Sequence, residues 1–376
     1  MRSPRRASIE RLLAELIETG VASAAVALVG NAEEVEGEWA AGWAREGVRA
    51  EPGSWFDFAS LTKPFIASLA LILDRDRSLA LRLPIGEVFA GAHPRLAGRP
   101  LEDLLRHRSG LGSWTPLYDP AVGTRRGRPA AGQTLAGICE LLLSGSLLGA
   151  RPGTYSDLDY LLWGMAAERV LGRSLGELVA ARVLAPLGLS ALASPGDLPQ
   201  VARSRMGTGR EAERAAAQGL SVASLPPPPI GLPQDGNGRF LAGLAGGAGA
   251  LFGFTGLFGP AHDLWRLGAE WLRPRRLLHR QAVAAALAGG SPFALGWWRR
   301  RCRGGGGPAL SPRAFGHTGF AGGNLWIDPD RRRVFTLLAH RIDPASDLNR
   351  WRRRFHEAAV ERLAAPQLSR AKEATR

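Results

Sequence analysis

The sequence predicts an α+β protein in which strands from both ends of the chain form one sheet. Strand-like segments occur near the start, at 22–30 and 38–43, and again near the end, at 325–328 and 334–339. Between about residues 75 and 290 the apolar residues follow mainly helical spacing. Strands at both termini with helices between them favour a single sheet and a helical insertion.

The N-terminal elements are a helix and a hairpin. Apolar residues at helical spacing, including Ile9 and Leu12, predict a helix over 7–19. The apolar run 22–30 predicts a buried strand. After a polar turn, 38–43 is expected to be its hairpin partner.

The next helix begins at Ser60 and continues through the apolar sequence LTKPFIASLALILD. Pro64 lies in its first turn, where a missing N–H costs little. A last helix is expected near 346–364, after the C-terminal strands. Loops interrupt the helical region at 109–120, 226–229 and 243–259.

We expect one catalytic domain over residues 7–365. Its α/β lobe comprises about 7–74 and 290–365, and its helical lobe about 75–289. Residues 366–376 are polar and predict a frayed tail. A chain of 376 residues is long enough to bury such a core.

The formal charge of +14 raises the possibility of an anionic partner. The arginines are scattered, however, and their densest runs, at 273–280 and 352–354, lie beside helical patterns typical of solvated faces. We therefore expect no nucleic-acid partner; a steep salt dependence of binding would indicate one. All but two of the 48 basic residues are arginine, the exceptions being Lys63 and Lys372. Lysine, unlike arginine, can be tuned into a base.

Neither a secretory signal nor a membrane span is expected. The start is amphipathic, and no run of about 18 or more apolar residues occurs. The only cysteines, Cys139 and Cys302, suit a reducing compartment better than a disulfide scaffold. We therefore expect a soluble, cytoplasmic protein, and nothing in the sequence specifies its oligomeric state.

The strongest local signal for chemistry is Ser60-Leu61-Thr62-Lys63 at a helix start. Residues three apart share a helix face, so the Lys63 amine would lie beside the Ser60 hydroxyl. Serine is a poor nucleophile until a neighbouring base takes its proton, and a helix N-terminus favours developing negative charge. Taken alone, the motif is equally consistent with Ser60 as an ordinary N-cap.

Two further segments follow in order, Gly153-Thr154-Tyr155-Ser156-Asp157 and His317-Thr318-Gly319. With Ser60 and Lys63 they resemble the S-x-x-K, Y-x-N and K-T-G or H-T-G elements of the serine β-lactamase and penicillin-binding protein superfamily. The chain is most similar to the class C-like branch, which includes β-lactamase-related esterases and D-alanyl-D-alanine carboxypeptidases. Further similarity to that branch occurs at 104–111, 185–192 and 315–330, and more loosely at 231–264.

The resemblance implies a β-lactamase/transpeptidase-like fold with the site in a cleft between the lobes. It implies that Ser60 is acylated and that Lys63 and Tyr155 move the proton, with the identity of the base left open. The oxyanion hole would be formed by the backbone N–H groups of Ser60 and Phe320. The residues implied to line the site along the edge strand are His317, Thr318 and Gly319.

The sequence departs from the family pattern at two positions. Asp157 stands where the family usually has Asn, and its carboxylate would raise the pKa of Lys63, or else bond a backbone amide at the helix start. His317 stands where β-lactamases usually have Lys. A largely neutral imidazole attracts the carboxylate of a β-lactam less strongly, which favours esters or small amides as substrates.

We therefore predict a serine hydrolase acting on small ester or amide substrates, without a cofactor or metal. β-Lactamase or D-alanyl-D-alanine carboxypeptidase activity is the alternative, and a catalytically inactive ligand-binding module is a further one. No G-x-S-x-G elbow occurs, and the HEAAV segment at His356 lacks the second histidine of a zinc motif.

Overall fold

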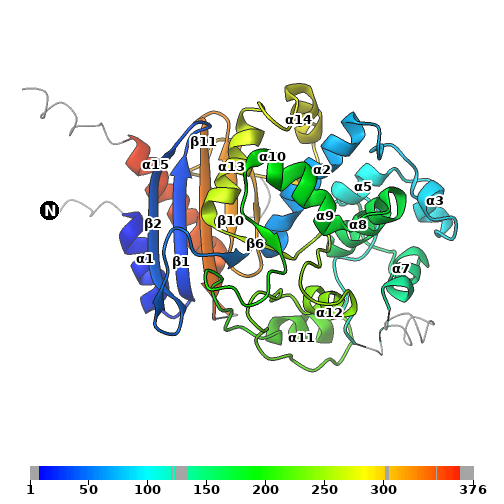
Figure 1. The fold of residues 1–376 in the computed structure, drawn as a ribbon, viewed down its shortest axis with the longest axis horizontal. Coiled ribbons are helices and arrows are strands. Elements are labelled where there is room, and N and C mark those ends of the chain that lie inside the picture. The colour runs from blue at the N-terminus through cyan, green and yellow to red at the C-terminus, as the bar shows by residue number, and fades with distance from the viewer. Residues whose placement is uncertain (1–7, 120–121, 123–133, 301–304, 344, 365–376) are drawn as a thin grey trace, which may run out of the picture.

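The computed structural model describes residues 8–119, 122, 134–300, 305–343 and 345–364, and its centre is an eight-stranded antiparallel sheet (Figure 1). The strand order is β3-β2-β1-β11-β10-β9-β8-β7, so strands from the two ends of the chain meet where β1 pairs with β11. This confirms the predicted α+β class. The strands are β1 (Ala22–Gly30), β2 (Val35–Arg45), β3 (Val48–Arg49), β7 (Phe293–Ala294), β8 (Trp297–Arg299), β9 (Phe315–Thr318), β10 (Asn324–Asp328) and β11 (Arg333–Arg341).

Helices cover both faces of this sheet. On one face lie α1 (Ile9–Glu18) and α15 (Leu348–Ala364), and on the other lies α13 (Ala261–Leu272) (Figure 1). Every residue of β1 is buried because its side chains alternate between two cores. Ala27 belongs to the core under α1 and α15, whereas Val26 belongs to the core shared with α13.

The position of α13 differs from the lobe assignment made from sequence. Its residues fall in the range expected to form the helical lobe, yet the helix packs on β10 and β11. Gly268 permits the close approach, because a Cβ there would lie 2.7 Å from Val334 Cγ1. Helical spacing predicts that a helix exists but does not indicate which layer it covers.

The remaining helices form a second lobe beside the sheet (Figure 1). A small sheet of β4 (Phe56–Asp57), β6 (Leu257–Gly259) and β5 (Leu192–Ala193) lies alongside them. The helices are α2 (Thr62–Arg75), α3 (Ile85–Val88), α4 (Pro94–Ala97), α5 (Leu101–Leu105), α7 (Leu135–Leu143), α8 (Asp157–Leu171), α9 (Leu175–Val179), α10 (Ala185–Leu187), α11 (Gly209–Ala216), α12 (Gly236–Leu244) and α14 (Arg280–Leu287), with a 3₁₀ turn at Ala59–Leu61 and a π-helical turn at Ala180–Leu184.

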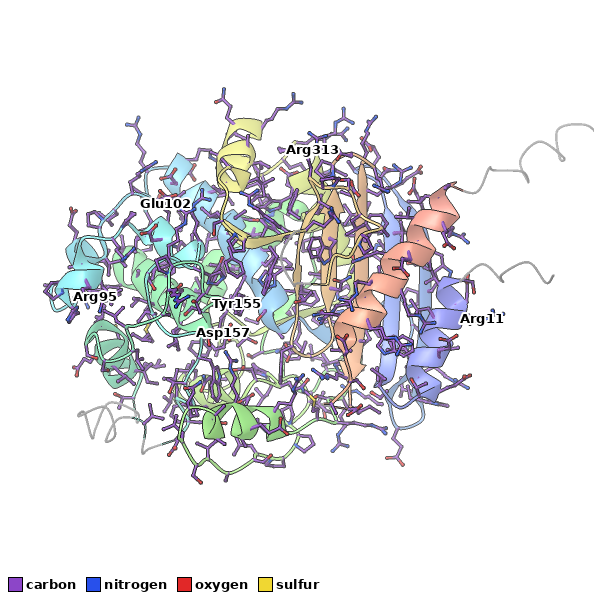
Figure 2. All side chains as sticks on the ribbon, turned by 180° about the vertical axis from the view of Figure 1, so that it is seen from behind. Arg11, Arg95, Glu102, Tyr155, Asp157 and Arg313 are labelled. Carbon is purple, nitrogen blue, oxygen red and sulfur yellow. The ribbon has the colours of Figure 1, made fainter. Side chains whose placement is uncertain are left out.

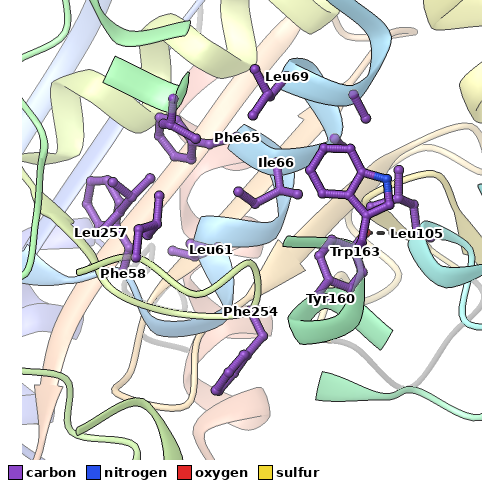
Figure 3. Close-up of a cluster of buried hydrophobic side chains, with 14 of the residues drawn as sticks. Phe58, Leu61, Phe65, Ile66, Leu69, Leu105, Tyr160, Trp163, Phe254 and Leu257 are labelled. Carbon is purple, nitrogen blue, oxygen red and sulfur yellow. Dashed lines mark hydrogen bonds between the residues drawn. The ribbon is translucent and has the colours of Figure 1, made fainter. Parts of the chain in front are cut away.

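Helix α2 is buried along almost its whole length and anchors the site. Phe65, Ile66 and Leu69 insert into the main core (Figure 3). Each such side chain contributes roughly 1.5–3 kcal/mol by burial. Tyr160 of α8 is buried in the same cluster, and its hydroxyl donates to the Leu105 carbonyl at 2.9 Å. Because α2 and α8 pack in the same core, the position of the first turn of α2 is fixed.

The short strands β7 and β8 are absent from the sequence prediction, and β9 was expected only through the family resemblance. β7, β8 and β9 contain two, three and four residues, too few to show a period. They also correct one expectation. β9, which carries His317 and Thr318, is not the edge strand, because β8 pairs with it at Phe315 and Gly316 and β7 follows β8.

Across the described ranges, no helix combines the length and the apolar character needed to cross a membrane.

Candidate active site

A buried carboxylate shapes the turn that presents Ser60. Ala59, immediately before it, has φ +46, a left-handed conformation that costs a non-glycine residue roughly 1–2 kcal/mol. Asp57 Oδ1 accepts a hydrogen bond from the Ala59 N–H at 2.7 Å, and Oδ2 accepts from the Gln234 N–H at 2.8 Å. Burial raises the pKa of Asp57 to about 6. The turn is thus tied both to β4 and to the loop before α12.

The Lys63 amine is fully buried one turn along from Ser60. It contacts three groups: Ser60 Oγ at 3.0 Å, Asp157 Oδ1 at 2.7 Å and the Phe254 carbonyl at 3.2 Å. A neutral amine has two N–H bonds and one lone pair. The two acceptors can take both N–H bonds, which leaves the lone pair for the Ser60 hydroxyl proton.

Burial decides the direction of the Lys63 pKa. Loss of solvation lowers the pKa from its usual value, and the Asp157 carboxylate opposes this shift without cancelling it. The expected contact between Asp157 and Lys63 is therefore present, and Asp157 acts to raise the pKa of Lys63 as expected, but burial makes the net shift downward. Aromatic rings surround the amine, with the Tyr155 centroid at 4.9 Å and the Tyr160 centroid at 5.4 Å.

Tyr155 lies on the other side of the nucleophile. Its hydroxyl donates to Ser60 Oγ at 2.9 Å. Burial, followed by the charge of Asp157, raises the pKa of Tyr155 well above its usual value. The phenol is accordingly protonated at neutral pH. Its ring packs against His107 and Trp298, with centroid distances of 4.7 and 5.2 Å.

The start of α8 positions Tyr155 and Asp157 together (Figure 2). Ser156 is the N-cap, and its Oγ accepts from the Asp159 N–H at 3.2 Å. The Asp157 N–H donates to the Ser113 carbonyl at 3.0 Å, which leaves the carboxylate to face Lys63. His107 holds the preceding loop, since its carbonyl accepts from the Gly153 N–H at 2.8 Å.

His317 is held as a neutral imidazole. The Trp298 indole N–H donates to His317 Nε2 at 3.1 Å, so Nε2 must be unprotonated. His317 Nδ1 lies 2.9 Å from the Thr318 carbonyl and donates to it. Burial, followed by the charge of Lys63, lowers the pKa of His317 well below its usual value. The ring is 2% exposed and is not among the residues that line the cleft.

A cleft of about 800 Å³ opens over Ser60. Thr318, Gly319 and Phe320 line it from the turn after β9, and Tyr155 and Asp157 line it from the start of α8. The turn approaches the nucleophile segment closely, because a Cβ on Gly319 would lie 2.7 Å from the Phe58 carbonyl oxygen. Both residues expected to supply oxyanion-hole N–H groups, Ser60 and Phe320, are thus at the cleft.

Several cleft residues lie outside every motif. Trp114 and Trp298 supply apolar wall, while Arg214 and Asp235 supply charge. Sequence spacing contains no signal for them, because each lies on a segment brought to Ser60 only by tertiary packing. The sequence contains eleven tryptophans, and its local pattern does not indicate which of them line the cleft.

Sequence similarity shows the family of the chain. Residues 9–359 match the Beta-lactamase family. A protein of Escherichia coli (strain K12) named "Putative D-alanyl-D-alanine carboxypeptidase" is 26% identical over 322 residues, covering 78% of this chain and 70% of that protein.

Solved structures share the fold. EstCE1, a hydrolase with promiscuous acyltransferase activity, superposes with a TM-score of 0.71 at 20% identity, covering 93% of this chain and 97% of that one. The class C beta lactamase from Rhodobacter sphaeroides gives a TM-score of 0.65 at 18% identity, covering 94% and 99%.

Proposed function

The chain belongs to the beta-lactamase family, and we propose that it is a serine hydrolase that forms an acyl-enzyme on Ser60 and acts on small esters or amides. The observation that carries this proposal is the set of three contacts around the Lys63 amine. Two acceptors can occupy the N–H bonds of the neutral amine, which makes its lone pair available to the Ser60 hydroxyl 3.0 Å away. The site combines residues from both lobes, which supports one catalytic domain.

The pKa directions support Lys63 as the base. Lys63 is shifted toward its neutral form and Tyr155 is held protonated. We therefore assign Lys63 as the group that takes the Ser60 proton while Oγ bonds to the substrate carbonyl carbon. The Ser60 and Phe320 N–H groups stabilise the resulting oxyanion.

Tyr155 then supplies a proton to the leaving group as its bond to the carbonyl carbon breaks. The proton that Lys63 holds restores the phenol. Water attacks the acyl-enzyme by the same route and releases Ser60. Each step uses only groups that lie at the cleft or within hydrogen-bond distance of Ser60.

The neutral His317 supports esters and small amides over β-lactams. Its two ring nitrogens are engaged by Trp298 and the Thr318 carbonyl, so it adds no fixed cation for a β-lactam carboxylate. β-Lactamase or carboxypeptidase-like activity is the second candidate, favoured by the names of the relatives. We expect a short-chain nitrophenyl ester to turn over faster than nitrocefin; a wide margin in favour of nitrocefin would contradict this role of His317.

Other classes of function are less well supported. A binding module that had lost catalysis would have no need for the joint arrangement of Ser60, Lys63 and Tyr155. For nucleic-acid binding, the arginines are dispersed: Arg95 and Arg313 lie at well-separated parts of the molecule (Figure 2).

The test is covalent labelling of Ser60. A fluorophosphonate probe or a fluorescent penicillin should increase the intact mass by one adduct in the natural protein and by none in Ser60→Ala. An adduct that persists in Ser60→Ala would place the nucleophile elsewhere. Labelling by neither reagent would favour the binding module.

A further inference from the structure

The wall of the cleft opposite the sheet carries cations that the proposed chemistry does not use. Four arginines line the cleft. Arg352 donates to the Gly319 and Gly323 carbonyls, and Arg341 donates to backbone carbonyls of the segment after β11. Arg210 and Arg214, both on α11, are different, because within the described residues neither donates to a backbone carbonyl or forms an ion pair with a carboxylate.

The Arg214 side chain is held in place before any ligand arrives. Its Nη2 donates to Ser113 Oγ at 2.9 Å, and its guanidinium lies 5.0 Å from the Trp114 ring centroid. Trp114 is 3% exposed, which makes it a fixed platform. Arg210 lies one turn earlier, on the same face of α11.

Burial changes the charge of the neighbouring carboxyl groups to different extents. Burial, together with the charge of Asp235, raises the pKa of Glu211, and burial raises that of Asp235. The pKa of Glu211 rises to about 8 and that of Asp235 to about 6, so at neutral pH Glu211 is largely uncharged whereas Asp235 keeps most of its charge. Asp157, the next carboxylate, accepts a hydrogen bond from the Lys63 amine at 2.7 Å and keeps its own negative charge when that amine is neutral.

Glu213 and Asp347 also line the cleft. Within the described residues neither Arg210 nor Arg214 is paired with any of these carboxyl groups, and Arg214 donates only to Ser113 Oγ, so its guanidinium keeps N–H groups for a ligand.

Arg214 is also electrostatically close to the reacting groups. Its charge contributes to lowering the pKa of Lys63 and opposes the rise in the pKa of Tyr155. A ligand group bound by Arg214 would thus lie within the same cleft as Ser60.

We propose that Arg214, with Arg210 beside it, recognises a carboxylate on the substrate, so that the preferred substrates are esters or amides bearing a second, anionic group. A guanidinium is planar and matches a carboxylate with two parallel hydrogen bonds. Because His317 is neutral and adds no cation, the arginines of α11 would bind this carboxylate. The inference rests on the proposed function and specifies its substrate class.

Matched ester pairs test it. In the first pair the anionic group is on the leaving group, and 4-acetoxybenzoate is compared with neutral 4-acetoxybenzamide. In the second pair it is on the acyl group, and the mono-4-nitrophenyl ester of suberic acid is compared with neutral 4-nitrophenyl octanoate. The measured quantity is the ratio of kcat/KM for the anionic ester to that for its neutral partner. We expect Arg214→Gln to reduce this ratio about five- to tenfold for at least one pair, since an exposed charge-assisted bond is partly screened. Arg214→Lys should retain part of it.

Controls separate the possible failures. Arg173→Gln removes an exposed arginine outside the cleft and should leave both ratios unchanged. Added salt should reduce the ratio in the natural protein. This inference would be overturned, and the proposed function kept, if both Arg214→Gln and Arg210→Gln left the ratios unchanged while neutral esters were still hydrolysed. No hydrolysis of any ester and no adduct on Ser60 would overturn the proposed function itself.

Discussion

At the scale of single residues, Lys63 is subject to two opposing effects. Its amine is removed from water, which disfavours the ammonium, and it touches a carboxylate, which favours it. Desolvation is the larger effect, so the amine is shifted toward the form that can accept a proton. The substitution of Asp157 for the usual Asn moderates this shift without reversing it.

Asp157→Asn tests that balance. The change removes the negative charge that favours the ammonium, so the pKa of Lys63 should fall further. If neutral Lys63 is the base, the acid limb of the pH dependence of kcat/KM moves to lower pH. The limb should be recorded with a neutral ester, and an unmoved limb would contradict control of Lys63 by Asp157.

Tyr155→Phe tests the proton donor. An alkoxide leaving group needs a proton, whereas 4-nitrophenolate leaves without one. We expect kcat to fall by roughly 10²–10⁴ for an alkyl ester and by much less for a nitrophenyl ester. Tyr160→Phe is the matched control, because its hydroxyl is bonded to the Leu105 carbonyl rather than to Ser60. Equal losses for both ester types in Tyr155→Phe would assign the tyrosine another role.

At the scale of elements, the turn before α2 combines strain with an acceptor that stabilises it. Ala59 is in a left-handed conformation, and the Asp57 carboxylate accepts from the N–H groups of Ala59 and Gln234. An asparagine at 57 can offer only one oxygen, so one buried N–H would lose its acceptor.

Two substitutions in this turn should change stability differently. Asp57→Asn should lower the free energy of unfolding by about 1–3 kcal/mol, the cost of a buried unsatisfied group. Ala59→Gly removes the steric penalty of the positive φ and should raise it by about 0–1 kcal/mol, since the added chain entropy offsets part of the gain. Urea unfolding of both variants at neutral pH measures the two changes. If Ala59→Gly lowered the free energy of unfolding as much as Asp57→Asn, the Asp57 carboxylate would not be compensating backbone strain at Ala59.

The longer elements were predictable because their periods extend over enough residues. The apolar run 22–30 matches β1, and the helix expected over 7–19 is α1 at Ile9–Glu18. The strands β7 to β9 are too short to show a period, and the attachment of α13 to the sheet depends on contacts distant in sequence. Local pattern contains neither kind of information.

The residues of the candidate site also fall into a predictable and an unpredictable group. Ser60, Lys63, Tyr155 and Asp157 were predictable because they occur in short motifs, and the structure brings them together. The residues around them, such as Trp298 and Arg214, reach the cleft from segments without a motif. The direction of the Lys63 pKa also depends on burial, which spacing does not reveal.

At the scale of the whole molecule, the sheet separates two apolar cores, and a histidine lies within the smaller one. His356 of α15 is fully buried, with Nδ1 2.7 Å from the Gly306 carbonyl and Nε2 3.0 Å from Asn324 Nδ2. These contacts hold the ring neutral, and burial lowers the pKa of His356 to about 4.

This histidine should make stability depend on pH. The unfolded chain binds a proton at His356 below about pH 6.5, whereas the folded chain does not until about pH 4. Stability is therefore full above pH 6.5 and is lost as the pH falls toward 4, by up to about 3 kcal/mol at 1.4 kcal/mol per unit. His356→Gln should flatten the fall of Tm between pH 6.5 and 4, and His279→Gln, an exposed control, should not. An identical slope in His356→Gln would show that other groups cause the acid loss.

The pairing of β1 with β11 joins segments some three hundred residues apart, and this order matters while the chain is being synthesised. When β8 has just emerged from the ribosome, the nascent chain already contains Ser60, Lys63 and Tyr155. At that point β1 still lacks its neighbour β11 on one side. An unpaired, apolar strand edge attracts other strands. Such chains lack the turn after β9 that lines the cleft, and the edge of β1 stays open to pairing with other chains until β11 emerges.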